Sequence, residues 1–113
     1  MEAKQTRDLI TTALKAEEEN ANKWGTTYSS MHEAYAVLKE EIEEAGDELD
    51  TLRKRLDVFW FYVRHSTTDN PEFKEMATKT NEVAINLAIE ALQIAAVSKK
   101  IIRTWREEND STL

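Results

Sequence analysis

The residues of this chain best suited to chemistry are glutamates near residue 40. They are Glu40, Glu41, Glu43, Glu44 and, one turn later, Glu48. At about 100° per residue, Glu41, Glu44 and Glu48 share one flank of a helix, whereas Glu40 and Glu43 face water. Carboxylates beside a packed helix can share a divalent cation with another helix. The alternative is an ordinary acidic surface.

A second stretch of the chain offers residues that would complete such a site. Residues 83–97 are apolar apart from one narrow polar stripe. With the preceding turn, its members are Glu82, Asn86, Glu90 and Gln93. This stripe is either the exposed edge of a central helix or the partner of the acidic flank. In the second case the metal ligands are Glu41, Glu44, Glu90 and Gln93. Such oxygen ligands suit Mg²⁺, with Mn²⁺ as a substitute.

Hydrophobic spacing predicts three helices that position these residues, over about residues 3–22, 30–65 and 71–108. Ser30 and Glu33 form a capping box at the start of the second helix, and each side chain is expected to bond the other's backbone N–H. In that helix, apolar residues alternate at gaps of four and three, the pattern of a packed helix. This apolar seam is Met31, Tyr35, Leu38, Ile42, Ala45, Leu49, Leu52, Leu56, Phe59 and Val63.

The predicted helices are long for a chain of this size. Residues 30–65 would span roughly 50 Å, so this helix either bends near Gly46 or protrudes and pairs with another subunit. Asn70 and Pro71 start the third helix, and residues 78–81 are polar enough to break it in two.

Composition indicates a single all-α domain over residues 1–113, with two Gly, one Pro and a third of the residues charged. Surplus apolar surface at residues 58–63 and 83–97 predicts a homodimer or homotetramer that completes four-helix packing. A net charge of −7 argues against nucleic acid as a partner. The absence of cysteine, of a signal-like segment and of a membrane-spanning segment leads us to expect a cytoplasmic protein without membrane contact.

Two aromatic residues and several lysines are candidates for substrate contacts. Trp24 and Tyr28 lie in the predicted loop before the acidic helix, as anchors on the core or as a stacking platform for a planar ligand. Lys39, Lys99 and Lys100 are the basic residues nearest the glutamates. They would contact phosphates or belong to solvated helix faces.

Residues 32–44, HEAYAVLKEEIEE, together with residues 89–96, IEALQIAA, resemble the MazG-like proteins of bacteria and their phages. These belong to the all-α nucleoside triphosphate pyrophosphohydrolase superfamily, and the resemblance covers residues 21–102. It implies Mg²⁺-dependent hydrolysis of a nucleoside triphosphate to a monophosphate and pyrophosphate. The family's Glu-x-x-Glu motif falls on Glu41 and Glu44, and its Glu-x-x-Asp motif falls on Glu90 and Gln93.

The departure from the family pattern is Gln93, where the enzymes carry Asp. An amide oxygen brings no charge, so we expect weaker metal binding and weaker activation of water. Within this reading, Glu41, Glu44 or Glu48 would orient or deprotonate the attacking water. The substrate would be contacted by Trp24, Tyr28, Lys39 and Lys100. Two alternatives remain: a module that binds a nucleotide or metal without turnover, and a helical oligomerisation protein of phage origin.

Overall fold

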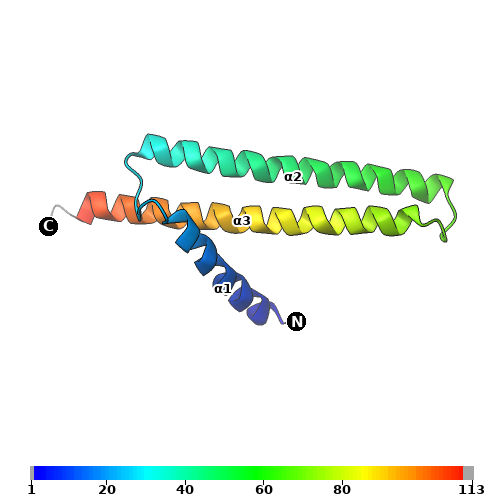
Figure 1. The fold of residues 1–113 in the computed structure, drawn as a ribbon, viewed down its shortest axis with the longest axis horizontal. Coiled ribbons are helices and arrows are strands. Elements are labelled where there is room, and N and C mark those ends of the chain that lie inside the picture. The colour runs from blue at the N-terminus through cyan, green and yellow to red at the C-terminus, as the bar shows by residue number, and fades with distance from the viewer. Residues whose placement is uncertain (1, 111–113) are drawn as a thin grey trace.

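The computed structural model describes residues 2–110, which form three α-helices and no β-strand. They are α1 (Ala3–Ala21), α2 (Met31–His65) and α3 (Glu72–Asp110). The long helices α2 and α3 lie side by side as an antiparallel hairpin, and α1 packs on α3 near one end before angling away (Figure 1). The all-α class and the three predicted helices are therefore confirmed. Within the described range, no helix combines the length and apolar character needed to cross a membrane.

Side-chain caps fix where the long helices begin. Ser30 Oγ accepts a hydrogen bond from the Glu33 backbone N–H at 3.1 Å, as an N-cap should. The prediction of a second capping-box bond, from the Ser30 backbone N–H to the Glu33 side chain, is wrong. The Glu33 carboxylate accepts a hydrogen bond from the Ser29 hydroxyl instead. At the start of α3, Asn70 Oδ1 accepts from the Glu72 N–H at 2.9 Å, and Pro71 needs no partner for its nitrogen.

Neither long helix is interrupted. α2 runs through Gly46 without a break, and the space where a side chain at Gly46 would lie is open. The suggested break at residues 78–81 is wrong, because α3 continues through them. The chain measures 69 × 32 × 20 Å, and its radius of gyration is 19.2 Å, against about 13 Å for a compact domain of this length. The hairpin therefore protrudes well beyond a compact shape.

The small core lies at the end of the hairpin that carries α1. Its buried apolar residues are Tyr28, Ala34, Ala96 and Val97. The loop between α1 and α2 is tied to α3 by the Tyr28 N–H, which donates to Thr104 Oγ1 at 2.9 Å. Lys100 Nζ also donates to the Ala21 carbonyl at 2.9 Å. These bonds join segments that are far apart in the sequence and hold the loop against the hairpin.

The apolar seam predicted for α2 is only partly used in the single chain. Leu38, Ala45 and Leu52 are half-buried, but the other seven members are exposed. α2 instead turns its acidic flank partly toward α3, so that Glu41 and Glu48 are less exposed than their neighbours. Two helices can bury only one side of each other, so most of the seam stays exposed in the single chain.

Candidate functional site

Three glutamates from the two long helices meet beside the hairpin. Glu41 and Glu44 come from α2, and Glu90 comes from α3. One carboxylate oxygen of each lies within 4.8 Å of those of the other two. The three-residue spacing of Glu41 and Glu44 puts both on the same flank of α2, and the antiparallel pairing brings Glu90 level with them. The structure thus assembles the three carboxylates into one cluster.

The cluster concentrates negative charge in a partly desolvated place. Burial raises the pKa of the Glu41 carboxyl, and the charges of Glu44 and Glu40 raise it further. Burial also raises the pKa of Glu90, as do Glu44 and Glu41. Carboxylates this close repel one another when all are ionised, so they favour a proton or a cation between them.

Gln93 stands between two of these carboxylates. With its amide oriented to satisfy its hydrogen bonds, Nε2 donates to Glu41 Oε2 at 3.1 Å and to Glu90 Oε2 at 3.0 Å. Rotating the amide by half a turn would point its oxygen at the same place. The side chain can therefore bridge the carboxylates as a donor or face a cation as a neutral ligand.

A cavity of about 320 Å³ extends from this cluster toward α1 and the loop that follows it. Its lining residues are Glu17, Asn20, Ala21, Trp24, Tyr28, Glu33, Val37, Glu41, Gln93, Val97 and Lys100. Two of the predicted metal ligands thus share a cavity with three of the four predicted substrate contacts. The two aromatic residues differ, because Tyr28 is buried in the core whereas Trp24 is 90% exposed. The prediction that these rings pack on the core is therefore confirmed for Tyr28 and wrong for Trp24.

The basic residues are mostly engaged elsewhere. Lys100 is buried, and its Nζ lies 4.4 Å from the centre of the Tyr28 ring while donating to Ala21. Lys39 forms an ion pair with Glu43 at 3.0 Å and does not line the cavity. Lys99 pairs with Glu18 at 3.0 Å. Only Lys100, of these three, brings its charge to the cavity.

The remaining glutamates lie outside the cluster. Glu40 and Glu43 are exposed, in agreement with their predicted orientation. Glu48 is half-buried one turn beyond Glu44 and does not join the three carboxylates. Glu17 of α1 was not predicted to take part, yet it lines the cavity and its charge raises the pKa of Glu41. The acidic run at residues 17–19 is the sequence feature from which Glu17 could have been found.

The donor set fits a hard divalent cation. The cluster offers only oxygen atoms from carboxylates, with one amide at its edge, and no described lysine or arginine forms an ion pair with it. Comparison of the chain with protein-family models, with curated proteins and with solved structures gave no match.

Proposed function

We propose that this chain is a Mg²⁺-dependent nucleoside triphosphate pyrophosphohydrolase, which splits a nucleoside triphosphate into a monophosphate and pyrophosphate. The convergence of Glu41, Glu44 and Glu90 beside a cavity with aromatic and basic residues supports the proposal. The resemblance of residues 32–44 and 89–96 to MazG-like proteins adds the reaction class. We further propose that the protein acts as a homodimer or homotetramer.

Glu41, Glu44 and Glu90 would hold the cation, with Gln93 as a fourth and weaker ligand. Mg²⁺ bound there would supply the positive charge that an acidic protein needs to accept a triphosphate, and would act as a Lewis acid on its oxygens. Because Gln93 brings no charge, three carboxylates must carry the affinity, and we expect weaker binding than with Asp at this position.

The residues around the cation would place the substrate and the water. Trp24, which is 90% exposed, presents an indole on which a nucleobase could stack, and it lines the same cavity as the buried Tyr28. Lys100 would act on the phosphates through its charge, because its Nζ is already engaged by Ala21. Glu41, Glu44 or Glu48, the last one turn beyond the cluster, would orient or deprotonate the attacking water.

A second candidate function is a helical oligomerisation element that holds neither a metal nor a nucleotide. The observation that favours it is the Gln93 amide, which can link Glu41 and Glu90 by two hydrogen bonds without any cation. In this reading the cluster only joins α2 to α3, and the protein serves as a helical oligomerisation element.

The decisive experiment measures binding and turnover in the same samples. Calorimetric titration with Mg²⁺ and Mn²⁺ reports the site, and pyrophosphate release from a panel of ribo- and deoxyribonucleoside triphosphates reports the reaction. Glu41→Gln should abolish both, whereas Glu40→Gln, one residue away on the water-facing side, should change neither. Gln93→Asp should tighten metal binding and raise turnover.

The outcomes separate the hydrolase from the structural element and from a module that binds without turnover. Metal binding and pyrophosphate release that both depend on Glu41 would support the hydrolase. Metal binding with no release of any product, even in Gln93→Asp, would favour the binding module. If neither the natural chain nor Gln93→Asp binds a divalent cation, the cluster is structural. Equal effects of Glu40→Gln and Glu41→Gln would contradict the assigned orientation of the helix.

A further inference from the structure

One side of α2 carries an uncovered row of apolar residues. We define this heptad stripe as Tyr35, Ile42, Leu49, Leu56 and Val63, which recur every seven residues. All five are exposed, from 41% for Leu49 to 67% for Leu56. A seven-residue repeat presents a continuous stripe to a partner helix. Within residues 2–110, α1 packs on α3 and leaves this stripe uncovered.

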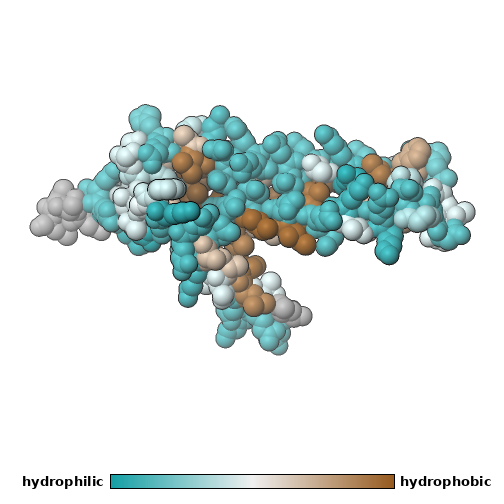
Figure 2. All heavy atoms as spheres, in the orientation of Figure 1, coloured by the Kyte–Doolittle hydropathy of each residue, from teal (hydrophilic) through white to brown (hydrophobic). Residues whose placement is uncertain are grey.

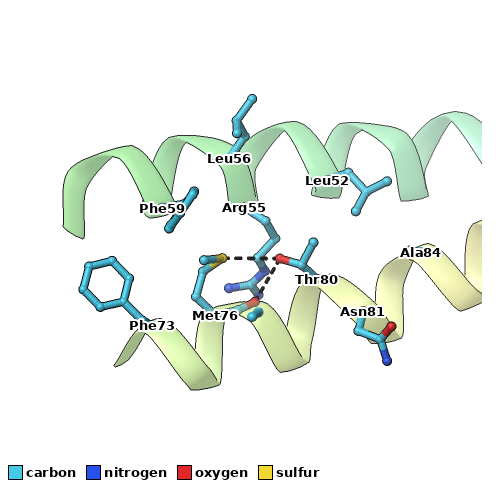
Figure 3. A pocket seen from close by; sticks show the side chains of 10 residues that line it. Leu52, Arg55, Leu56, Phe59, Phe73, Met76, Thr80, Asn81 and Ala84 are labelled. Atoms are coloured by element: carbon cyan, nitrogen blue, oxygen red, sulfur yellow. Dashed lines mark hydrogen bonds between the residues drawn. The ribbon is translucent and has the colours of Figure 1, made fainter. Parts of the chain in front are cut away.

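The stripe borders an apolar groove between α2 and α3, in the half of the hairpin that α1 does not reach. The groove has a volume of about 730 Å³, and Figure 3 shows Leu52, Phe59 and Phe73 around it. Its lining comes from both helices and includes Leu56 of the heptad stripe, together with Met76 and Ala77 of α3. Arg55 is its one charged member. Such a groove accepts the apolar side chains of another helix.

The charges along α2 are strongly segregated. Residues 31–50 contain eight acidic residues and one lysine, a net charge of −7. Residues 51–65 contain four basic residues and one aspartate, a net charge of +3. Two copies of α2 therefore attract when they run antiparallel and repel when they run parallel.

We propose that a second copy of this chain docks on the heptad stripe, with the two α2 helices antiparallel and the two-fold axis beside Leu49. Leu49 is the middle member of the stripe, so this register aligns both stripes over their whole length. It places the partner's Ile42 level with Leu56, and the partner's Tyr35 level with Val63. The first half of the partner's α2, which carries the acidic residues, then lies over the groove of this copy with its apolar stripe facing the groove.

The geometry favours this arrangement over a parallel pair. A two-fold contact is self-complementary, so each copy fills the other's groove. The stripe from Tyr35 to Val63 is about 42 Å long, which suits an extended helix–helix interface. A parallel pair would place the two −7 segments against each other and leave both grooves at the same end. The assembly does not depend on cation binding by Glu41, Glu44 and Glu90.

Single cysteines test the register cleanly, because the natural chain contains no cysteine. Under mild oxidation, Leu49→Cys should cross-link to itself. Ile42→Cys and Leu56→Cys should each stay uncross-linked alone but form a mixed disulfide when combined. Asp47→Cys is the matched control, because its exposed side chain faces away from the stripe and should not react. Self-linking of all three stripe variants would overturn the antiparallel arrangement, and linking of none would overturn the interface.

Sedimentation of the full chain provides the second measurement. The natural protein should have at least twice the mass of one chain at micromolar concentration. Leu56→Glu should weaken association by about tenfold or more, because it places an unpaired charge in an apolar contact. Helix content by circular dichroism should remain, since Leu56 is exposed in the single chain. A monomeric natural protein, or an association unaffected by Leu56→Glu, would overturn the proposal.

Discussion

The two ends of the helical hairpin are packed by different means. At the end that carries α1, the most deeply buried residues are small, with Ala34, Ala96 and Thr104 each 2% exposed. At the other end, the contacts join aromatic rings, with Phe59 and Phe73 edge to face at 6.0 Å between ring centres. Much of that aromatic surface still faces solvent. One end is closed within a single chain and the other is open.

This difference separates folding from association. The closed end is held by hydrogen bonds between segments 76 and 79 residues apart, so it defines the fold of one chain. The open end has apolar residues along α2 and α3, and within the part of the chain that the structure describes no third helix packs over them. In Figure 2, apolar side chains also gather along α1 and the adjoining part of α3. The same substitution should therefore unfold the protein at one end and only dissociate it at the other.

The largest expected effect comes from placing a carboxylate at each end. Val97→Glu puts a charge into the closed core and should lower the free energy of unfolding by at least about 3 kcal/mol. Leu56→Glu, at the open end, should change the unfolding of a dilute monomer by less than about 0.5 kcal/mol. Urea denaturation followed by circular dichroism measures both. Similar losses for the two variants would contradict the comparison.

A smaller effect is expected where the loop is tied to α3. Thr104→Val removes the oxygen that accepts the Tyr28 N–H and leaves this buried donor unpaired. The cost should be about 1–3 kcal/mol in urea denaturation. Thr104→Ser keeps the hydroxyl and should retain most of the stability. If Val and Ser are equally tolerated, the hydrogen bond does not fix the loop.

Local features of the fold could be predicted from the sequence. Periodicity describes well the features that depend on residues a few positions apart. These features are the helix bounds, the Asn70 cap and the shared flank of Glu41 and Glu44. Glu90 could be added because its stripe was the only polar one on an apolar helix. These predictions use geometry that a helix carries by itself.

Contacts between distant segments could not be predicted in the same way. Thr104 is decisive for the loop, yet a single threonine in a helix gives no signal that it bonds Tyr28. Trp24 and Tyr28 looked equivalent in sequence, but only Tyr28, whose backbone is hydrogen-bonded to Thr104, buries its ring. The apolar seam of α2 likewise does not reveal which of its members a partner helix covers, because exposure depends on contacts that periodicity alone does not describe.

A modest gain in stability is expected between the two ends, at Gly46. A methyl group there would meet no atom within 4 Å, and the helix is continuous. Gly46→Ala should raise the free energy of unfolding by about 0.5–1 kcal/mol, since Gly costs backbone entropy inside a helix. Metal binding should stay the same. A loss of stability would mean that α2 bends at this point in solution.

The smallest effect concerns the acidic cluster and depends on pH. Burial and the neighbouring carboxylates raise the pKa of Glu41 and of Glu90 in the folded protein, so the folded state keeps protons that the unfolded chain releases. Stability is therefore lost as the pH rises from the unfolded pKa, about 4.3, through the folded value. Glu90→Gln removes one of the repelling charges.

In the absence of divalent cations, Glu90→Gln should melt at a higher temperature than the natural chain, and the difference should grow as the pH is raised from 4 to 7. Because solvent screens the charges at this partly exposed site, the gain in stability should be smaller than that of Gly46→Ala. Glu43→Gln is the control, because Glu43 lies outside the cluster, and its melting temperature should not gain with pH in this way. Mg²⁺ should stabilise the natural chain and not Glu90→Gln. If the difference in melting temperature did not depend on pH, the three carboxylates would not repel one another. The electrostatic reason for a cation between them would then be removed.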